Sequence, residues 1–520
     1  MITENLKYLK KLIYLLSFLC FVIQTVLSNN IIDFSSVLII FLSNVVLTFY
    51  CFNEENFPQY AISSNIIFTS HLINFGGALY LKTIEFELFT NTLLLPMKTS
   101  LMCSLFSLSL IIAHIFYKRS FFVNKLKNSL SEFYFKNDLI KVESDKLLIF
   151  LGLIALFFRF TIYDLNTSLA YQTSSETLPP LFRDIAIGFS FFIYAPLLIL
   201  FSGNFYNIKK KINNLIVLIF LICIFFFSLS INNRSLFFDN FLLIFFILLI
   251  YFQLGHYKVD KYFSFKVLII IILSIPTLNF VDTLSKTYLL ERSSLYERSP
   301  IQNFSSTFSR MLSYHDTKKE VDALIRKQTD FLGEGEWYYN NSFFNRINIL
   351  KINDRYNYTF SYISKEKIND IKKVELKKII SLVPQPIINI FDSSFDKNRY
   401  LNFSMASYIY NQYNPDIFLQ FNIGSFVFSI IHYFTYFWPV CMFISGIFIF
   451  AFFDSLYHRA SNTISPIAFI IFYTTAIGML NIFTLSEVAK TVSFVLRMVP
   501  QTIILYYLSV KIFRLLYKKK

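Results

Sequence analysis

The sequence predicts an all-α, polytopic membrane protein with about 12 transmembrane helices and one large, mostly helical external loop domain. Composition is the first reason. Hydrophobic residues make up 55% of the 520 residues and charged residues only 16%, whereas charged residues are about 25% of ordinary soluble domains. The second reason is that nearly uncharged runs recur along the chain and approach or exceed the ~18 residues that a membrane-spanning helix needs.

Twelve apolar intervals define the expected spans, and a polar interval separates the first nine from the last three. We therefore divide the chain into an N-terminal membrane region (1–281, about nine transmembrane helices), a loop domain (282–422) and a C-terminal membrane region (423–520, about three transmembrane helices). The expected spans are 12–27, 31–52, 60–81, 99–117, 147–164, 184–203, 214–231, 235–253, 266–281, 432–453, 463–483 and 491–513.

The distribution of basic residues predicts the orientation. With the N-terminus inside, 22 lysines and arginines fall in cytoplasmic segments and 5 in the short outside loops, as the positive-inside rule requires. Both termini are then cytoplasmic and the interval 282–422 is external. The acidic loop 53–59 is the exception. The net charge of +15 is mostly a consequence of this topology, so it does not indicate binding to nucleic acid.

The polar interval has the composition of a folded domain. It contains 19 lysines and arginines against 16 acidic residues, a mixed balance that is typical of a solvated surface. Apolar residues recur at helical spacing in 317–331 and 364–383. Pro384 and Pro386 are expected to end the second helix, because proline cannot continue one.

The sequence indicates no metal site and no cofactor. The five cysteines form no CxxC pair and none lies in the polar interval, so neither a disulfide framework nor a zinc site is supported. No Walker, GxGxxG or GxSxG motif occurs. Nucleotide-driven transport and serine hydrolase chemistry therefore have no support.

Charged residues inside or beside the spans are the first functional candidates, because burying them in a bilayer is costly. The guanidinium groups of the arginines in this set suit bidentate binding of phosphate oxygens. The alternative is snorkelling to the interface, or pairing between helices such as Arg497 with Asp239. The members of this set are Arg159, Arg234, Asp239, Glu487 and Arg497.

The polar interval and the following span supply further candidates. Trp337 and Tyr338 present flat rings that suit sugar faces, or they belong to a domain core or an interfacial belt. Asp392 and Arg399 lie on the return to the membrane, where a carboxylate can act as a base or belong to a solvated charge run. His432 has no metal-binding spacing around it, which favours an ordinary core or solvated histidine.

The order of these features resembles the Wzy-type O-antigen and repeat-unit polymerases, over roughly residues 215–515. A short external turn ends in Arg234 and opens a span, and Val383-Pro384-Gln385-Pro386 is similar to the Pro-x-x-Pro element on the return of the large loop. Gly424 and the set Asn481, Glu487 and Arg497 match features near the last spans. The Arg–ten residues–Gly motif of some members is absent from the external loops, and His432 does not fit the histidine pattern of O-antigen ligases.

The resemblance implies glycosyl transfer at the periplasmic face of the bacterial inner membrane, between undecaprenyl-pyrophosphate-linked glycans, without metal or nucleotide. It implies Arg234, Arg399 and Arg497 as clamps on the leaving group, and Glu487 or Asp392 as the base. Arg159, Asp239, Trp337, Tyr338 and His432 are expected substrate-binding residues. Membrane lipids, a chain-length regulator and a flippase of the same pathway are the expected partners. The alternatives are a ligase-like glycan transferase, a lipid-linked oligosaccharide flippase or transporter, and a membrane scaffold.

Overall fold

The structure is a computed structural model in which helices account for nearly all regular elements. It describes residues 2–140, 144–162, 180–204, 214–230, 234–257, 279–280, 282–287, 290, 300–313, 319–320, 338–341, 343–383, 385–401, 404–413, 424–459, 463–473, 483 and 487–517. Within these ranges the exception is a pair of two-residue antiparallel strands, β1 (Tyr457–His458) and β2 (Thr463–Ile464). The all-helical prediction is confirmed for the described residues, apart from this pair.

The helices that precede the polar interval are α1 (Ile2–Leu27), α2 (Ile31–Cys51), η1 (Glu54–Asn56), α3 (Ala61–His71), η2 (Leu72–Gly76), α4 (Gly77–Ile84), α5 (Pro96–Arg119), α6 (Phe121–Lys136), α7 (Asp145–Ile162), α9 (Pro180–Ser190), η3 (Phe191–Asn204), α10 (Asn214–Ser230) and α11 (Arg234–Gln253). Those within it are α13 (Pro300–Leu312), α15 (Phe344–Ile347), α16 (Leu350–Tyr362), α17 (Lys365–Ile380), α18 (Gln385–Phe391), α19 (Asn398–Leu401) and α20 (Met405–Tyr413). Those that follow are α21 (Phe426–Phe434), η5 (Thr435–Phe437), α22 (Trp438–Asp454), α23 (Pro466–Tyr473), α24 (Val488–Ser493), η7 (Phe494–Met498) and α25 (Val499–Tyr517).

Five of the described helical segments are long and apolar enough to cross a membrane: Ile2–Leu27, Ile31–Cys51, Pro96–Arg119, Phe426–Asp454 and Val488–Leu516. Shorter apolar helices cover Ile185–Phe201, Asn214–Leu229 and Leu243–Gln253. These helices define a multi-pass membrane protein. Each of the twelve expected spans meets a described helix except 266–281, which lies outside the described residues but for its last residues.

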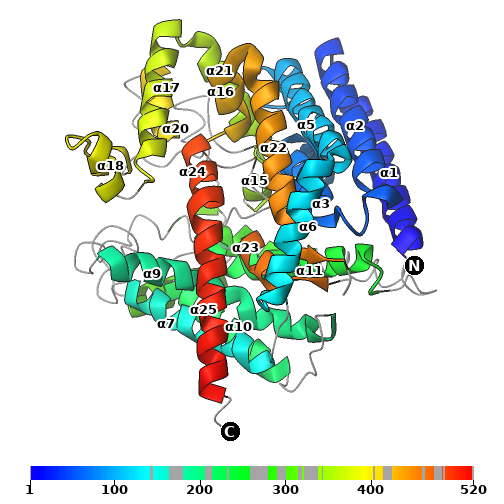
Figure 1. Cartoon of the computed structure of the whole chain (residues 1–520). Helices are drawn as coiled ribbons and strands as arrows, with labels where there is room; N and C mark the ends of the chain where they lie inside the picture. The colour runs from blue at the N-terminus through cyan, green and yellow to red at the C-terminus, as the bar shows by residue number, and fades with distance from the viewer. Residues whose placement is uncertain are drawn as a thin grey trace.

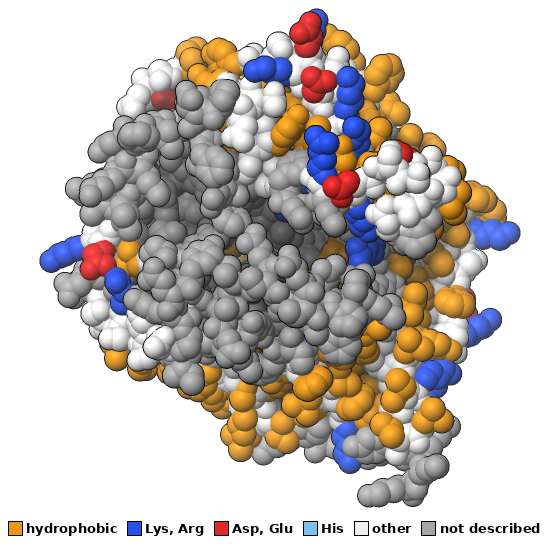
Figure 2. All heavy atoms as spheres, turned by 90° about the vertical axis from the view of Figure 1, so that its left-hand side faces the viewer, with side chains coloured by type: hydrophobic (Ala, Val, Ile, Leu, Met, Phe, Trp, Pro, Cys, Tyr) orange, Lys and Arg blue, Asp and Glu red, His pale blue; other side chains and the backbone are white. Residues whose placement is uncertain are grey.

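The helices form two groups, and α11 contacts both, packing against α1 and α3 on one side and against α10 and η3 on the other. Figure 1 shows α1, α2, α5 and α22 side by side in the upper part, and α7, α9 and α10 in the lower part, with contacts within each group. Figure 2 shows charged side chains gathered on the upper part of one face and hydrophobic ones over its lower part. The charged end is the one at which α16, α17 and α21 lie.

The helix expected at 364–383 is confirmed as α17 (Lys365–Ile380). The Ser364 side chain caps it by accepting a hydrogen bond from the Lys367 N–H. Glu366 lies in the first turn and Lys377 and Lys378 in the last turn, which complements the helix dipole. The helix expected at 317–331 lies outside the described residues except for 319–320.

Helix α16 ties the polar interval to the membrane helices. It packs against η2, α5, α20 and α21. Its Asp354, fully buried, accepts hydrogen bonds from the N–H groups of Leu94 (2.5 Å) and Leu95 (2.9 Å) and from the Thr99 hydroxyl (2.9 Å). These groups lie at the start of α5, whose own N-cap residue, Leu95, has no capping side chain. Asp354 therefore supplies the cap from 259 residues along the chain.

Replacing Asp354 by alanine is expected to lower the free energy of unfolding by about 2–4 kcal/mol, because leaving a buried donor unsatisfied costs roughly 1–3 kcal/mol. The change in the free energy of unfolding is measured by unfolding the detergent-solubilised protein in a denaturing detergent. Asp370→Ala, on the exposed face of α17, is the matched control and should change the value by less than ~0.5 kcal/mol. Equal stability of the two variants would mean that Asp354 does not cap α5.

Candidate active site

Helix α16 is rich in polar residues yet almost wholly buried. Asn353 donates from its amide nitrogen to the Asn74 carbonyl (3.0 Å), and its amide oxygen accepts from the Ser425 hydroxyl (2.6 Å). Asn357 donates to the Thr99 hydroxyl (3.0 Å). Buried polar groups persist when they are paired in this way. These bonds fix α16 between η2 and the start of α21, where charged groups also meet.

Two buried glutamates, Glu375 and Glu487, lie beside this helix, and we call them the acid pair. Glu375 is in α17 and Glu487 directly precedes α24, and each is 3% exposed. Glu487 Oε1 accepts from the Met405 N–H (2.7 Å), and its Oε2 is 2.8 Å from Lys378 Nζ. Glu375 accepts from the Ala489 N–H (2.7 Å). Helices α17 and α24 are thereby joined through their charged residues.

The two carboxyls have pKa values that are shifted in opposite directions. Burial raises the pKa of Glu375 to about 7, and the nearby charge of Glu487 adds to the increase. Burial also acts to raise the pKa of Glu487, but Lys490 and Lys378 outweigh it, so that this pKa is lowered. At neutral pH Glu487 is therefore an anion, whereas Glu375 exchanges a proton. Such a divergence is typical of acid–base pairs in enzymes.

Aromatic rings and a glycine enclose the acid pair. The Tyr433 hydroxyl donates to Glu375 Oε2 (3.4 Å). A Cβ at Gly424 would lie 3.3 Å from the Tyr356 hydroxyl oxygen and 3.4 Å from Glu487 Cγ. The Tyr356 ring packs on that of Tyr410, with centroids 5.6 Å apart. Gly424, which the sequence singles out, therefore lies against both Tyr356 and Glu487, and a side chain there would crowd the Tyr356 hydroxyl.

Among the predicted catalytic residues whose side chains the structure describes, Glu487 lies in this cluster, and Arg497, Asp392 and Arg399 lie elsewhere. Arg497 is exposed on η7, ten residues beyond Glu487, which is about 15 Å along a helix. Asp392 is exposed after α18 and accepts from the backbone and hydroxyl of Ser394 (3.0 and 2.6 Å). Arg399 is exposed on α19, 6.0 Å from the centre of the Tyr400 ring. Within the described part of the chain, neither Asp392 nor Arg399 contacts the acid pair.

The remaining predicted clamp and binding residues of the membrane region lie on α11 and α7. Arg234 begins α11 and Asp239 lies within it, but their side chains fall outside the described part of the structure. Arg159, in the last turn of α7, donates from Nε to the Ser190 carbonyl (3.4 Å). Helices α7 and α9 lie in the lower group, whereas α17 and α24 lie above them (Figure 1).

Of the predicted aromatic and histidine residues, Tyr338 is buried and His432 is half-buried. Tyr338 is 4% exposed, donates its hydroxyl to the Phe89 carbonyl and lies under Lys82 Nζ, 4.4 Å from the ring centre. Trp337 lies outside the described residues. His432 stacks on Phe360, with ring centroids 4.5 Å apart. The described surroundings of Tyr338 and His432 are thus those of core side chains.

Sequence reasoning did not identify Glu375 or Lys378 as site residues. Both lie in the charged helix 364–383, most of whose other charged residues, such as Glu366, Lys373 and Lys377, are exposed. A usable signal is their spacing, because Ile371, Glu375 and Lys378 recur at i, i+4 and i+7 on one helical face. Ile371 is fully buried, so a charge in register with it indicates a buried charge.

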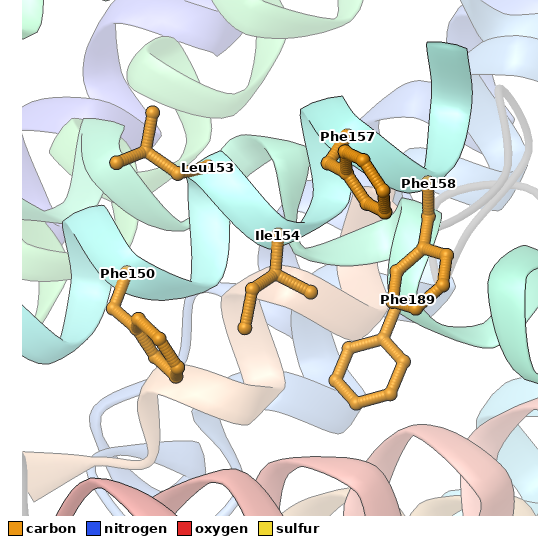
Figure 3. Close-up of a pocket in the computed structure, with 6 residues that line it drawn as sticks. All are labelled: Phe150, Leu153, Ile154, Phe157, Phe158 and Phe189. Carbon is orange, nitrogen blue, oxygen red and sulfur yellow. The ribbon is translucent and has the colours of Figure 1, made fainter. Parts of the chain in front are cut away.

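An apolar groove of about 520 Å³ opens between α7 and α9 and is lined by Phe150, Leu153, Ile154, Phe157, Phe158 and Phe189 (Figure 3). It offers no charged or hydrogen-bonding side chain among those residues. Within the described part of the chain no group of three or more His, Cys, Asp or Glu side chains is arranged to hold a metal ion. The acid pair is therefore the best candidate for chemistry.

The apolar helices and the acid pair together define the class as a multi-pass membrane protein with a buried ionisable site. Comparison with protein-family models, with curated proteins and with solved structures found no match in any of the three.

Proposed function

We propose that the chain is a membrane glycosyltransferase that polymerises undecaprenyl-pyrophosphate-linked repeat units of O-antigen or capsule at the periplasmic face of the bacterial inner membrane. The observation that best supports this is the acid pair at the junction of the polar interval with two membrane helices. Glu487 directly precedes the span Val488–Leu516, and Gly424 lies just before the span Phe426–Asp454. A lipid-linked substrate presents its pyrophosphate and sugars at such a junction.

The reaction joins an acceptor hydroxyl to the anomeric carbon of the donor glycan. The hydroxyl oxygen forms the new bond, the bond from that carbon to the pyrophosphate breaks, and the pyrophosphate leaves with the electron pair. The hydroxyl proton passes to a base. The Glu375 carboxylate suits this step, because general bases work best when their pKa is near the operating pH and its pKa is about 7.

The cations near the acid pair suit the leaving group. Lys378 lies 2.8 Å from Glu487 and Lys490 4.0 Å from it, and Lys490 is well exposed. Positive groups that are fixed in place stabilise charge developing on a pyrophosphate. In this proposal Glu487 holds the two lysines, and Arg234, Arg399 and Arg497 are further candidates for clamps. Pyrophosphate is already a good leaving group, so the proposal needs neither nucleotide nor metal.

Deleting the gene in its host and resolving the surface glycan on a gel tests the proposal. Loss of the chain-length ladder with one repeat retained supports a polymerase. Loss of all surface repeats would support a flippase or a ligase-like transferase instead, and an unchanged ladder would exclude the polymerase. The orientation, with both termini cytoplasmic and 282–422 periplasmic, is tested by cysteine labelling from each side of the membrane.

Arg234→Ala is expected to reduce polymerisation by ~100-fold or more, as removal of a fixed charge-stabilising group does. Arg234→Lys should restore it only partly, because lysine lacks the bidentate fork. Complementation of the deletion strain, with the membrane level of each variant checked, provides the measurement. Arg310→Ala, which removes an exposed ion pair with Glu320, is the control. Full activity of Arg234→Ala would remove this residue from the site.

A further inference from the structure

A cluster of three tyrosines on α16 and α20 has no part in the site described above. Its members are Tyr358 and Tyr362, one turn apart on α16, and Tyr413 at the end of α20. The ring centroids of Tyr358 and Tyr362 are 4.6 Å apart, and Tyr413 lies 6.3 Å from the first and 6.4 Å from the second. We call these three residues the tyrosine platform.

The tyrosine platform is accessible, unlike the other aromatic clusters on these helices. Tyr362 is 65% exposed, and Tyr358 and Tyr413 are half-buried. By contrast, Tyr356 and Tyr410, on the same two helices, are 1% and 3% exposed. Large apolar rings gathered at a surface are typical of binding sites.

Hydrogen-bonding groups border the tyrosine platform. Ser361 is exposed, and its hydroxyl accepts from Lys98 Nζ (3.1 Å). Lys367 is also exposed and donates from Nζ to the Gln412 carbonyl (2.8 Å). A sugar ring offers both an apolar C–H face, which packs on an aromatic ring, and hydroxyls around its edge, which need hydrogen-bond partners. Rings with polar groups at their border match this chemistry.

The tyrosine platform and the acid pair lie on opposite sides of the same helix pair. Tyr356 is two residues before Tyr358 on α16, about 200° around the helix, and its hydroxyl points towards Gly424, beside Glu487. On α20, Tyr410 packs on Tyr356, whereas Tyr413 packs on Tyr358. A polymer with one end at the acid pair can therefore reach the tyrosine platform by crossing the edge of α16 and α20.

We propose that the tyrosine platform binds sugar rings of the glycan chain at a distance from the reacting end, an inference that rests on the proposed function. The alternative role for surface tyrosines is anchoring in the lipid interface. The first turn of α17, directly after Tyr362, is exposed and carries Lys365, Glu366 and Lys367. Charges of both signs beside the rings favour water and glycan over acyl chains as the neighbours of the tyrosine platform.

The test is binding of the host's own surface polysaccharide, released by mild acid, to the full-length protein in detergent, measured by saturation-transfer NMR. Wild type and the double variant Tyr362→Phe/Tyr413→Phe should bind it. The double variant Tyr362→Ala/Tyr413→Ala should bind at least ~4-fold more weakly, since each lost ring contact weakens binding by about 2–10-fold. Tyr436→Ala, at a tyrosine that is 95% exposed on η5, is the control and should bind normally.

If the alanine double variant binds the polysaccharide as well as wild type does, or if wild type does not bind it, the proposal that the tyrosine platform binds glycan is overturned. Loss of the alanine double variant from the membrane, with its polysaccharide binding intact, assigns the rings to lipid anchoring and also overturns it. The glycan ladder of the deletion strain is read separately. An unchanged ladder together with tyrosine-dependent binding would leave the tyrosine platform standing while excluding the polymerase.

Discussion

Replacing Lys378 by methionine is expected to lower the free energy of unfolding by about 3–5 kcal/mol, the cost of breaking a buried ion pair by removing one partner. Lys378 and Glu487 are both nearly inaccessible, and their charged atoms are 2.8 Å apart. Without Lys378, Glu487 would keep Lys490 as its partner at 4.0 Å. Because Lys490 is well exposed, water screens much of its attraction.

Two further variants separate the contribution of the Lys378–Glu487 ion pair to stability from other effects of the substitution. Lys378→Met/Glu487→Gln removes both charges and keeps an oxygen to accept from the Met405 N–H, so it should be more stable than Lys378→Met alone. Lys373→Met is the matched control on the same helix, because it breaks an exposed pair with Asp370 and should cost no more than ~1 kcal/mol. Unfolding in a denaturing detergent gives all three values. If Lys378→Met lowers the free energy of unfolding no more than the control does, the Lys378–Glu487 ion pair does not hold α17 to α24.

The membrane helices could be predicted from the sequence because their signal is local. A long uncharged run has no stable alternative to a helix in a bilayer, and α1, α2 and α5 lie where those runs are. The N-terminus of α17 is equally local, since Ser364 and Glu366 supply its cap and favourable charge. Where neighbouring residues alone determine a helix, the sequence is sufficient to predict it.

The buried polar helix α16 could not be predicted from such patterns. Its Asn353 and Asp354 resemble solvated residues in the sequence, but their partners are Asn74 and the start of α5, more than 250 residues away. A polar side chain can be buried only when such partners are present, and one sequence does not show which segments meet. The same holds for the acid pair: the sequence predicted Glu487, but neither Glu375 nor Lys378, the ion-pair partner of Glu487.

The pKa of Glu375 gives the protein a defined dependence on pH. The folded-state pKa is about 7, against 4.5 for an ordinary glutamate. Between these values the folded protein holds a proton that the unfolded chain has released, so stability falls as pH rises through this window. At 1.36 kcal/mol per pKa unit, ionising Glu375 opposes folding by about 3 kcal/mol above pH 7. Below pH 4.5 the effect is absent.

Glu375→Gln separates a role in the reaction from a role in stability. The glutamine oxygen can still accept from the Ala489 N–H, and the side chain cannot ionise. We therefore expect stability at pH 8 to rise by about 1–3 kcal/mol, with no change below pH 4.5, while polymerisation falls by ~10²–10⁴-fold, as loss of a general base does. Glu366→Gln, exposed on the same helix, is the control: it should leave polymerisation unchanged and lower stability by no more than ~1 kcal/mol, the usual contribution of an acidic residue in the first turn of a helix. A stable Glu375→Gln variant with a normal glycan ladder would exclude Glu375 as the base. A variant that is more stable than wild type but inactive would indicate that the reaction needs the buried carboxylate, although its ionisation costs stability.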